Sequence, residues 1–265
     1  MTDSPLLRVD NLATHFTITD NGRKRVLKAV DGVSFEVGRG ETVGIVGESG
    51  SGKSTVARTI MGLEPAASGS ILFDGIDLTT LGARAYRGQR RRIQMVFQDP
   101  FASLNPRMRI GEIVAEPLLV HDGMRLRAGI AEARELLERV GLPADSVERY
   151  PHEFSGGQRQ RIGIARALAS KPDLMIADEP VSALDVSIQA QLLNLMKDLQ
   201  RDLGLSILFI SHDLNVVRYM CTRTVVMYHG KVVEYGATDD LWTDPQHDYT
   251  RTLLSAIPHL ARSAG

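Results

Sequence analysis

The chain has 265 residues, of which 43% are hydrophobic and 24% charged, as in ordinary globular proteins. Its net charge of −1 provides no overall field that would attract nucleic acid or an anionic membrane surface. Its single cysteine excludes an intrachain disulfide and a Cys-rich metal site. At this length we expect one large domain, or a domain with attached lobes.

We expect neither a signal peptide nor a membrane-spanning helix. Residues 1–20 lack a basic start followed by an apolar stretch. The strongest apolar run, residues 207–210, is far shorter than the ~20 residues that a spanning helix needs. Contact with a membrane would therefore depend on a protein partner.

The strand patterns change along the chain. Near the start, residues 7–9 and 33–37 alternate apolar with polar side chains, which is typical of half-exposed antiparallel strands. Later strands are predicted from continuous apolar runs, as in a parallel sheet covered by helices on both faces. These runs are residues 43–46, 95–97, 174–177 and 207–210.

Two helical regions lie among these strands. Residues 110–141 are helix-like, stand between two predicted core strands and contain no strand pattern of their own, so we interpret them as an inserted helical lobe. A later helix is predicted from an apolar stripe at helical spacing, made by Ile188, Leu192, Leu195 and Leu199.

Residues 47–54 match the phosphate-loop pattern G-x-x-x-x-G-K-[ST] in full. The pattern follows a predicted strand and precedes a predicted helix, whereas a chance Gly/Ser turn containing a lysine would need neither. Glycines let backbone amides surround phosphate oxygens, and the helix N-terminus adds positive potential. Lys53 would bridge the β- and γ-phosphates, and the Ser54 hydroxyl would bind Mg²⁺.

Two acids follow the predicted strand at 174–177. Asp178, at the carboxyl end of the strand, is placed to hold Mg²⁺ through water, and Glu179 can polarise a water in line with the γ-phosphate. An acid pair after a strand is often a solvated edge, but a complete phosphate loop favours the catalytic interpretation. Residues 170–173 resemble a guanine-reading tetrapeptide of GTPases but precede their strand, so we predict a turn there.

Ser155-Gly156-Gly157-Gln158 opens another predicted helix. Ser155 and Gln158 form a capping-box pair, and the two glycines expose backbone amides beside them. A simple helix cap is the alternative. Because the phosphate loop already accounts for one nucleotide, this second anion-binding helix start indicates a nucleotide held by another copy or a partner chain.

These motifs resemble the ATPase subunits of the ABC transporter family, and the resemblance covers nearly the whole chain. Phe154–Gln158 is similar to the family signature Leu-Ser-Gly-Gly-Gln, with Phe154 in place of leucine. That change is apolar and leaves the serine and glycines intact. In the family this motif closes over ATP bound to the opposite subunit, which implies a second ATPase subunit, either identical or paralogous.

Further positions fit the same family. Gln98 is similar to the Q-loop glutamine, which contacts Mg²⁺ and water and senses the membrane partner. Ser182–Asp185 is similar to the D-loop, which lies along the dimer interface, and His212 to the switch histidine that contacts the γ-phosphate. Phe16 stands where the family has an aromatic that stacks on adenine, although a core role is equally plausible.

The resemblance implies a site for ATP and Mg²⁺. The expected nucleotide contacts are Phe16, Gly47, Glu48, Ser49, Gly50, Ser51, Gly52, Lys53, Ser54, Thr55, Ser155, Gly156, Gly157, Gln158 and Asp185. The expected metal contacts, direct or through water, are Ser54, Gln98 and Asp178, and the expected catalytic residues are Glu179, His212 and Gln98.

The resemblance also implies an α/β fold of the P-loop NTPase (ABC ATPase) type. It has a mainly parallel sheet, an N-terminal antiparallel β subdomain and an inserted α-helical subdomain. We expect one nucleotide-binding domain over residues 1–265. Its parts are an ATPase core with the antiparallel lobe at 1–98 and 166–240, a helical signature subdomain at 99–165 and a C-terminal family tail at 241–265.

Two segments are similar to the branch of importers for oligopeptides, dipeptides and nickel: Gln98–Pro106 and His247–Pro258. The tail is also consistent with a plain amphipathic end helix. The branch implies an ATP-hydrolysing subunit that energises uptake of peptides or a related small solute. Its implied partners are two transmembrane permease subunits and an extracytoplasmic solute-binding protein, and its implied location is the cytoplasmic face of the inner membrane.

The alternatives differ in features visible in sequence. A DNA-repair ATPase of this superfamily would carry a long coiled-coil insertion, a ribosome-associated ABC protein would have two cassettes, and a small-molecule kinase would lack residues 155–158 and His212. An ABC-type ATPase or regulatory nucleotide-binding module not coupled to transport is the remaining alternative. We expect no nucleic-acid partner, because the basic run 87–92 has no neighbouring aromatics and is predicted to be a solvated face.

Overall fold

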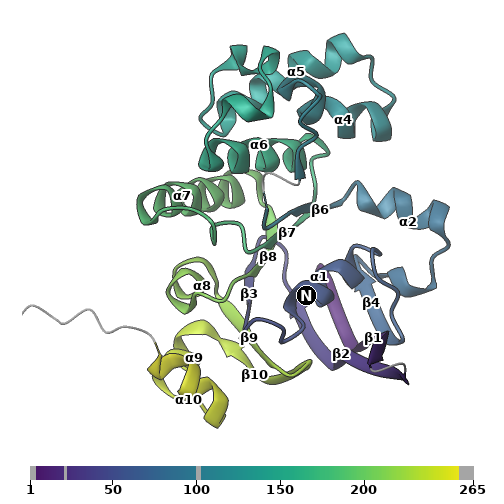
Figure 1. Ribbon diagram of the computed structural model, residues 1–265, viewed down its shortest axis with the longest axis vertical. Coiled ribbons are helices and arrows are strands. Elements are labelled where there is room, and N and C mark those ends of the chain that lie inside the picture. The colour runs from purple at the N-terminus through teal and green to yellow at the C-terminus, as the bar shows by residue number, and fades with distance from the viewer. Residues whose placement is uncertain (1–3, 21–22, 100–102, 257–265) are drawn as a thin grey trace, which may run out of the picture.

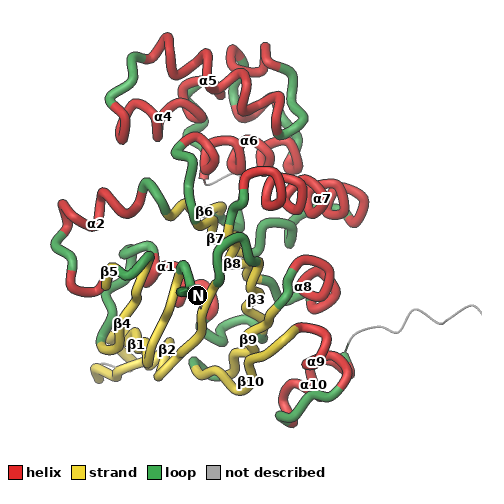
Figure 2. Tube along the Cα trace, turned by 180° about the vertical axis from the view of Figure 1, so that it is seen from behind, coloured by secondary structure: helices red, strands yellow, loops and turns green. Residues whose placement is uncertain are grey.

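The structure, a computed structural model, describes residues 4–20, 23–99 and 103–256. Figure 1 shows two sheets and a helical lobe, and Figure 2 shows the same arrangement from behind. None of the helices in the described ranges combines the length and the apolar character that crossing a membrane requires.

The antiparallel sheet is built largely from the first 77 residues, in the order β2-β1-β4-β5. Its strands are β1 (Leu7–Asp20), β2 (Arg23–Val37), β4 (Ser68–Phe73) and β5 (Ile76–Asp77). The alternating patterns predicted antiparallel strands here but gave only short pieces of β1 and β2. The outer half of β2, residues 23–28, is exposed. It was not predicted because a strand segment without a buried face shows no alternation of apolar and polar residues.

The second sheet has the order β10-β9-β3-β8-β7-β6 and is parallel except at β10. Its strands are β3 (Thr42–Val46), β6 (Ile93–Val96), β7 (Leu174–Asp178), β8 (Ser206–Ile210), β9 (Arg223–Tyr228) and β10 (Lys231–Ala237). All four predicted core strands are present. The strand expected to include Phe97 ends one residue earlier, and Phe97 is 37% exposed.

The parallel sheet separates two hydrophobic clusters, and β8 illustrates the division. Ile207 and Phe209 belong to the cluster shared with the helical lobe, whereas Leu208 and Ile210 belong to the cluster shared with the antiparallel sheet and α1 (Lys53–Ile60). Successive side chains of a strand point to opposite faces. A strand buried on both faces must therefore be apolar at every position, as the sequence predicted.

The helical lobe lies between β6 and β7 in the chain and forms the top of Figure 1. It contains α4 (Ile110–Asp122), α5 (Leu126–Arg139) and α6 (Gly156–Ala169), with short 3-10 turns at Ala144–Glu148 and Pro151–Glu153. The inserted lobe was predicted. The turn predicted at residues 170–173 joins α6 to β7.

The remaining helices are α2 (Ala83–Arg90), α7 (Val186–Leu203), α8 (Leu214–Met220), α9 (Thr238–Thr243) and α10 (Asp248–Ser255), with a 3-10 turn at Leu78–Thr80. The buried stripe of α7 differs from the predicted one in two members. Leu193 and Met196 are buried together with Leu192 and Leu199, whereas Ile188 and Leu195 are only partly buried.

The basic run 87–92 was expected to be a solvated face, which is only partly correct. Helix α2 buries none of its residues. Arg92, however, pairs with both Asp74 (2.7 Å) and Asp173 (2.5 Å), and Arg90 donates to the carbonyl oxygens of Met61 and Gly62. Arg90 therefore ties α2 to the end of α1, and Arg92 links the turns at Asp74 and Asp173, which border the two sheets.

Candidate functional site

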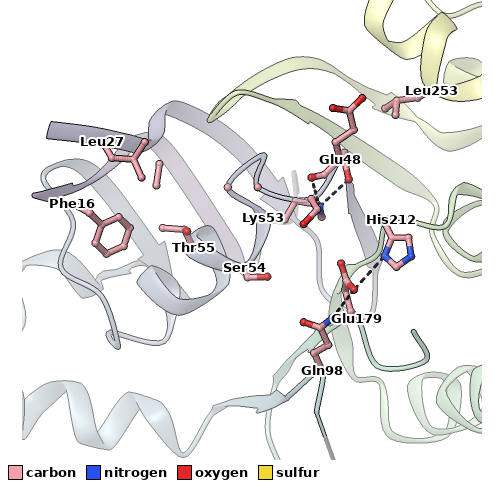
Figure 3. A pocket seen from close by; sticks show the side chains of 15 residues that line it. Phe16, Leu27, Glu48, Lys53, Ser54, Thr55, Gln98, Glu179, His212 and Leu253 are labelled. Atoms are coloured by element: carbon pink, nitrogen blue, oxygen red, sulfur yellow. Dashed lines mark hydrogen bonds and ion pairs between the residues drawn. The ribbon is translucent and has the colours of Figure 1, made fainter. Parts of the chain in front are cut away.

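One cavity of about 800 Å³ lies where β3, β7 and β8 end. Its volume is in the range of small-molecule sites. It is lined by Phe16, Leu27, Ala29, Gly47, Glu48, Ser49, Gly50, Gly52, Lys53, Ser54, Thr55, Gln98, Glu179, His212 and Leu253 (Figure 3). Four of the lining segments lie at the carboxyl edge of the parallel sheet: residues 47–55 after β3, Gln98 after β6, Glu179 after β7 and His212 after β8.

The phosphate loop runs from the end of β3 to the start of α1, as its sequence pattern predicts. A Cβ atom on Gly47 would lie 2.2 Å from the Met227 carbonyl oxygen, and one on Gly52 would lie 2.3 Å from that of Ala29. These two positions therefore need glycine because neighbouring backbone lies against them. The resulting loop is held closely between β9 and β2.

Lys53 points into this loop. Its Nζ donates to the carbonyl oxygens of Gly47 and Glu48, each at 2.8 Å (Figure 3). Burial lowers the pKa of Lys53, and the nearby carboxylates of Glu179 and Asp178 oppose this shift. An anion bound in the loop would supply the stronger, charged acceptor that such a partly desolvated ammonium lacks.

Ser54 and Asp178 form an oxygen pair beneath the loop. The Ser54 hydroxyl donates to Asp178 Oδ1 at 2.9 Å, and Asp178 is 5% exposed. Burial raises the pKa of Asp178 and the negative charge of Glu179 adds to the rise, while the Ser54 hydrogen bond opposes it. Asp178 lines an adjoining cavity that shares Ser54 and Gln98 with the main one. Hydroxyl and carboxylate oxygens are ligands of the kind that Mg²⁺ takes.

Glu179 is the centre of a three-residue contact at the other side of the loop. Gln98 Nε2 donates to Glu179 Oε2 at 3.0 Å, and the same oxygen lies 3.2 Å from His212 Nδ1 (Figure 3). The backbone of Glu179 has φ of 48°, a conformation that non-glycine residues seldom adopt. Its amide donates to the Ile210 carbonyl oxygen at 2.9 Å, which fixes this turn against β8.

Phe16 lines the wall of the cavity and belongs to neither buried hydrophobic cluster. It is paired with Leu27 across the β1–β2 ladder, and both side chains line the cavity. Thr55 completes this end of the site (Figure 3). The wall offers an aromatic face and apolar surface, which suit a flat heterocycle.

Residues 155–158 lie outside the cavity. The predicted capping box is present: the Gln158 amide donates to Ser155 Oγ (3.3 Å), and the Ser155 amide donates to Gln158 Oε1 (3.0 Å). Ser155 and Gln158 are exposed, as is Asp185 at the start of α7. These residues do not meet the phosphate loop of their own chain. Ser51, another predicted contact, is buried within the loop.

Sequence reasoning missed three cavity residues: Leu27, Ala29 and Leu253. The first two lie on β2 and become visible only through its register with β1, in which Leu27 faces Phe16. Leu253 comes from α10, whose place beside the phosphate loop no local pattern indicates. The tail was predicted without a role in the site.

The model of the ABC transporter family matches residues 30–182, which span most of this cavity. The chain belongs to the ABC transporter family. It is therefore an ATP-binding ATPase. The ABC cassette MJ0796, solved as a dimer in a post-hydrolysis state bound to ADP and Pi, has a TM-score of 0.78 and 30% identity, covering 88% of this chain and 98% of that one. The fold predicted from the sequence is thereby confirmed.

Among curated relatives of this ABC ATPase are two proteins whose names concern peptides. A putative peptide import ATP-binding protein of Brucella abortus is 57% identical over 97% of this chain and 80% of the relative. The oligopeptide transport ATP-binding protein OppF of Escherichia coli is 52% identical over 96% of this chain and 78% of the relative. Both alignments extend far beyond the family model, into the tail.

Proposed function

We propose that this ABC ATPase energises the uptake of oligopeptides, dipeptides or a related small solute. The observation that carries the ATPase part is the convergence of Lys53, Gln98, Glu179 and His212 on one cavity with an apolar wall. The solute class is supported by the names of relatives more than 50% identical over 96–97% of this chain.

The roles of the site residues follow from their positions. Phe16 stacks on the base, and the loop amides with Lys53 hold the phosphates. Glu179 accepts a proton from the attacking water, and its contact with Gln98 and His212 orients the carboxylate. His212 then donates a hydrogen bond to the γ-phosphate as negative charge shifts during transfer.

Mg²⁺ is part of this proposal. Ser54 and Asp178, with Gln98 beside them, would hold it at the point where a hydroxyl and a carboxylate already meet. The ion would neutralise charge on the β- and γ-phosphates. One carboxylate is sufficient, because Mg²⁺ takes its remaining ligands from phosphates and water. No group of three or more His, Cys, Asp or Glu side chains suited to a metal occurs among the described residues.

We further propose that ATP is enclosed between two ATPase subunits, identical or paralogous. The support is the helix start at Ser155–Gln158, where Ser155 and Gln158 are exposed and lie outside the cavity of their own chain, together with exposed Asp185. ATP would favour the closed pair because it binds that state more tightly. Hydrolysis would remove the bridging phosphate and reopen the pair. Residues 99–165 would then act as the signature subdomain, although α6 continues to Ala169.

The proposed partners are two permease subunits and, through them, an extracytoplasmic solute-binding protein. The proposed place of action is the cytoplasmic face of the inner membrane, without a nucleic-acid partner. Residues 241–265 remain the proposed family tail. Of the two segments that resemble the peptide-importer branch, residues 100–102 and 257–258 lie outside the described residues.

The subunit arrangement is tested with a chain that binds ATP without hydrolysing it. Glu179→Gln with ATP and Mg²⁺ is expected to become dimeric by light scattering, and a further Ser155→Arg change should keep it monomeric. Thr80→Arg, also at an exposed hydroxyl, is the matched control and should leave the dimer intact. Dimerisation that survives Ser155→Arg would contradict the shared site.

The transport function needs the assembled complex. The chain is purified together with candidate permease subunits, and ATP turnover is measured in vesicles with and without solute-binding protein and candidate peptides. We expect stimulation by peptides. Turnover that responds to none of these components would support the alternative, an ATPase not coupled to transport.

A further inference from the structure

Helix α10 contacts the phosphate loop through Tyr249. The Glu48 amide donates to the Tyr249 hydroxyl at 3.1 Å, across 201 residues of sequence. Glu48 is exposed, whereas Tyr249 is 9% exposed. The second residue of the phosphate loop is therefore held from outside the loop by a largely buried side chain of the tail.

The ring of Tyr249 is supported from the sheet. Tyr228, at the end of β9, packs against it with ring centroids 4.1 Å apart. Strand β9 is the parallel neighbour of β3, the strand that leads into the loop. Packing against Tyr228 thus orients the Tyr249 hydroxyl toward Glu48, and Tyr228 belongs to the same sheet that carries the loop.

The segment before α10 is also fixed. The amides of Gln246 and His247 donate to the Glu234 carboxylate at 2.7 Å and 3.1 Å, and His247 Nδ1 accepts from the Tyr249 amide at 3.1 Å. One turn beyond Tyr249, Leu253 lines the nucleotide cavity (Figure 3). Since residues four apart lie on the same helix face, α10 presents both side chains to the site.

Both backbone polar groups of Glu48 are therefore hydrogen-bonded: its amide donates to Tyr249, and its carbonyl oxygen accepts from Lys53. The proposed function requires Lys53 to turn toward the phosphates. When it does, the bond from Lys53 to the Glu48 carbonyl is lost, and the bond that the Glu48 amide donates to Tyr249 remains. An ordered loop loses less conformational freedom when it binds a ligand, so this bond favours nucleotide binding.

We propose that Tyr249 is a positioning residue, which preorganises the phosphate loop by accepting the Glu48 amide and makes α10 part of the nucleotide site. The proposal rests on the proposed role of the loop. Because Tyr249 acts on the loop and not on the γ-phosphate, it supports ATP and ADP binding equally. It contributes to affinity and not to the chemical step.

The test is Tyr249→Phe, which keeps the ring and removes the hydroxyl. We expect Kd for ATP and for ADP, and KM for ATP, each to rise about fivefold, the effect of one lost hydrogen bond to a backbone amide. The kcat value at saturating ATP should stay within about twofold of the original. Unchanged Kd for both nucleotides would overturn the proposal.

Tyr235→Phe is the matched control. The Tyr235 hydroxyl accepts from the Glu36 amide (3.4 Å) and donates to its carbonyl oxygen (3.1 Å), away from the cavity. Its loss should lower Tm but leave Kd unchanged. Lys53→Ala in the same titrations separates the two proposals. Retained binding in Lys53→Ala would reject the loop assignment itself, whereas lost binding there with unchanged Tyr249→Phe would reject only the role of Tyr249.

Amide hydrogen exchange in the unaltered chain gives a second measurement. We expect the Glu48 amide to exchange more slowly than the amides of its exposed neighbours Ser49 and Gly50, and to lose this protection in Tyr249→Phe. Equal exchange at the three positions in the unaltered chain would overturn the proposal, whatever the variant does.

Discussion

Glu179 Oε2 lies 3.2 Å from His212 Nδ1, and the two residues follow the neighbouring parallel strands β7 and β8. His212 has a 57% exposed side chain, whereas that of Glu179 is 14% exposed. The carboxylate is thus held at the base of the site, and the imidazole stands above it, toward solvent. These positions suit Glu179 as a base that receives a proton and His212 as a hydrogen-bond donor that reaches a phosphate.

Glu179→Gln should reduce ATP turnover by ~10²–10⁴, because the amide cannot accept the proton of the attacking water. Gln is nearly isosteric, so Kd for ATP should be preserved. Phosphate release at saturating ATP and equilibrium titration measure the two quantities. Near-normal turnover would assign the base to another residue.

His212→Ala should lower kcat by ~10²–10³ with little effect on KM, as expected for a donor that acts on charge developing in the transition state. The double variant Glu179→Gln, His212→Ala should be little slower than the slower single variant, because residues that act as a unit are not additive. If the rate reductions of the two single variants multiply in the double variant in single-turnover assays, the two residues act independently.

The sequence predicted the parts of this site that a single stretch of chain encodes. The phosphate loop needs its glycines, and the strand before Asp178 needs apolar residues on both faces, so both leave local patterns. Leu27 and Leu253 leave none, because the first depends on strand register and the second on where the last helix packs. The outer half of β2 was missed for the related reason that it has little buried surface.

Asp178→Asn should raise the Tm at pH 7 while it impairs Mg²⁺-dependent turnover. Burial raises the pKa of Asp178, so between its ordinary value of 3.8 and the raised value the folded chain binds more protons than the unfolded chain. Stability therefore falls as pH rises through that window, and the cost is fully present once the pH exceeds the raised value. Asn carries no charge and so removes this cost, and its side-chain oxygen can still accept the hydrogen bond from Ser54. The gain should disappear as pH approaches 3.8.

Asp74→Asn provides a comparison of opposite sign. Hydrogen bonds from Arg92 and Arg39 lower the pKa of Asp74, so its ionised form stabilises the fold above pH 3.8 and this stabilisation is lost as pH falls through the lowered value. The Asn variant should therefore have a lower Tm at pH 7. Thermal unfolding of both variants from pH 4 to pH 8 tests the signs, and a destabilised Asp178→Asn chain would contradict the first prediction.

Phe16→Ala should weaken ATP binding by about 5- to 150-fold, since stacking of a base on an aromatic ring contributes ~1–3 kcal/mol. Phe16→Tyr retains a ring and should bind as the original chain does. Inorganic tripolyphosphate, which lacks a base, separates stacking from a general distortion of the cavity. Its inhibition constant should be the same in Phe16→Ala as in the unaltered chain, because Phe16 and the phosphate loop lie at different ends of the site. Equal weakening of both ligands would instead mean that Phe16 supports the fold of the loop and does not contact the base.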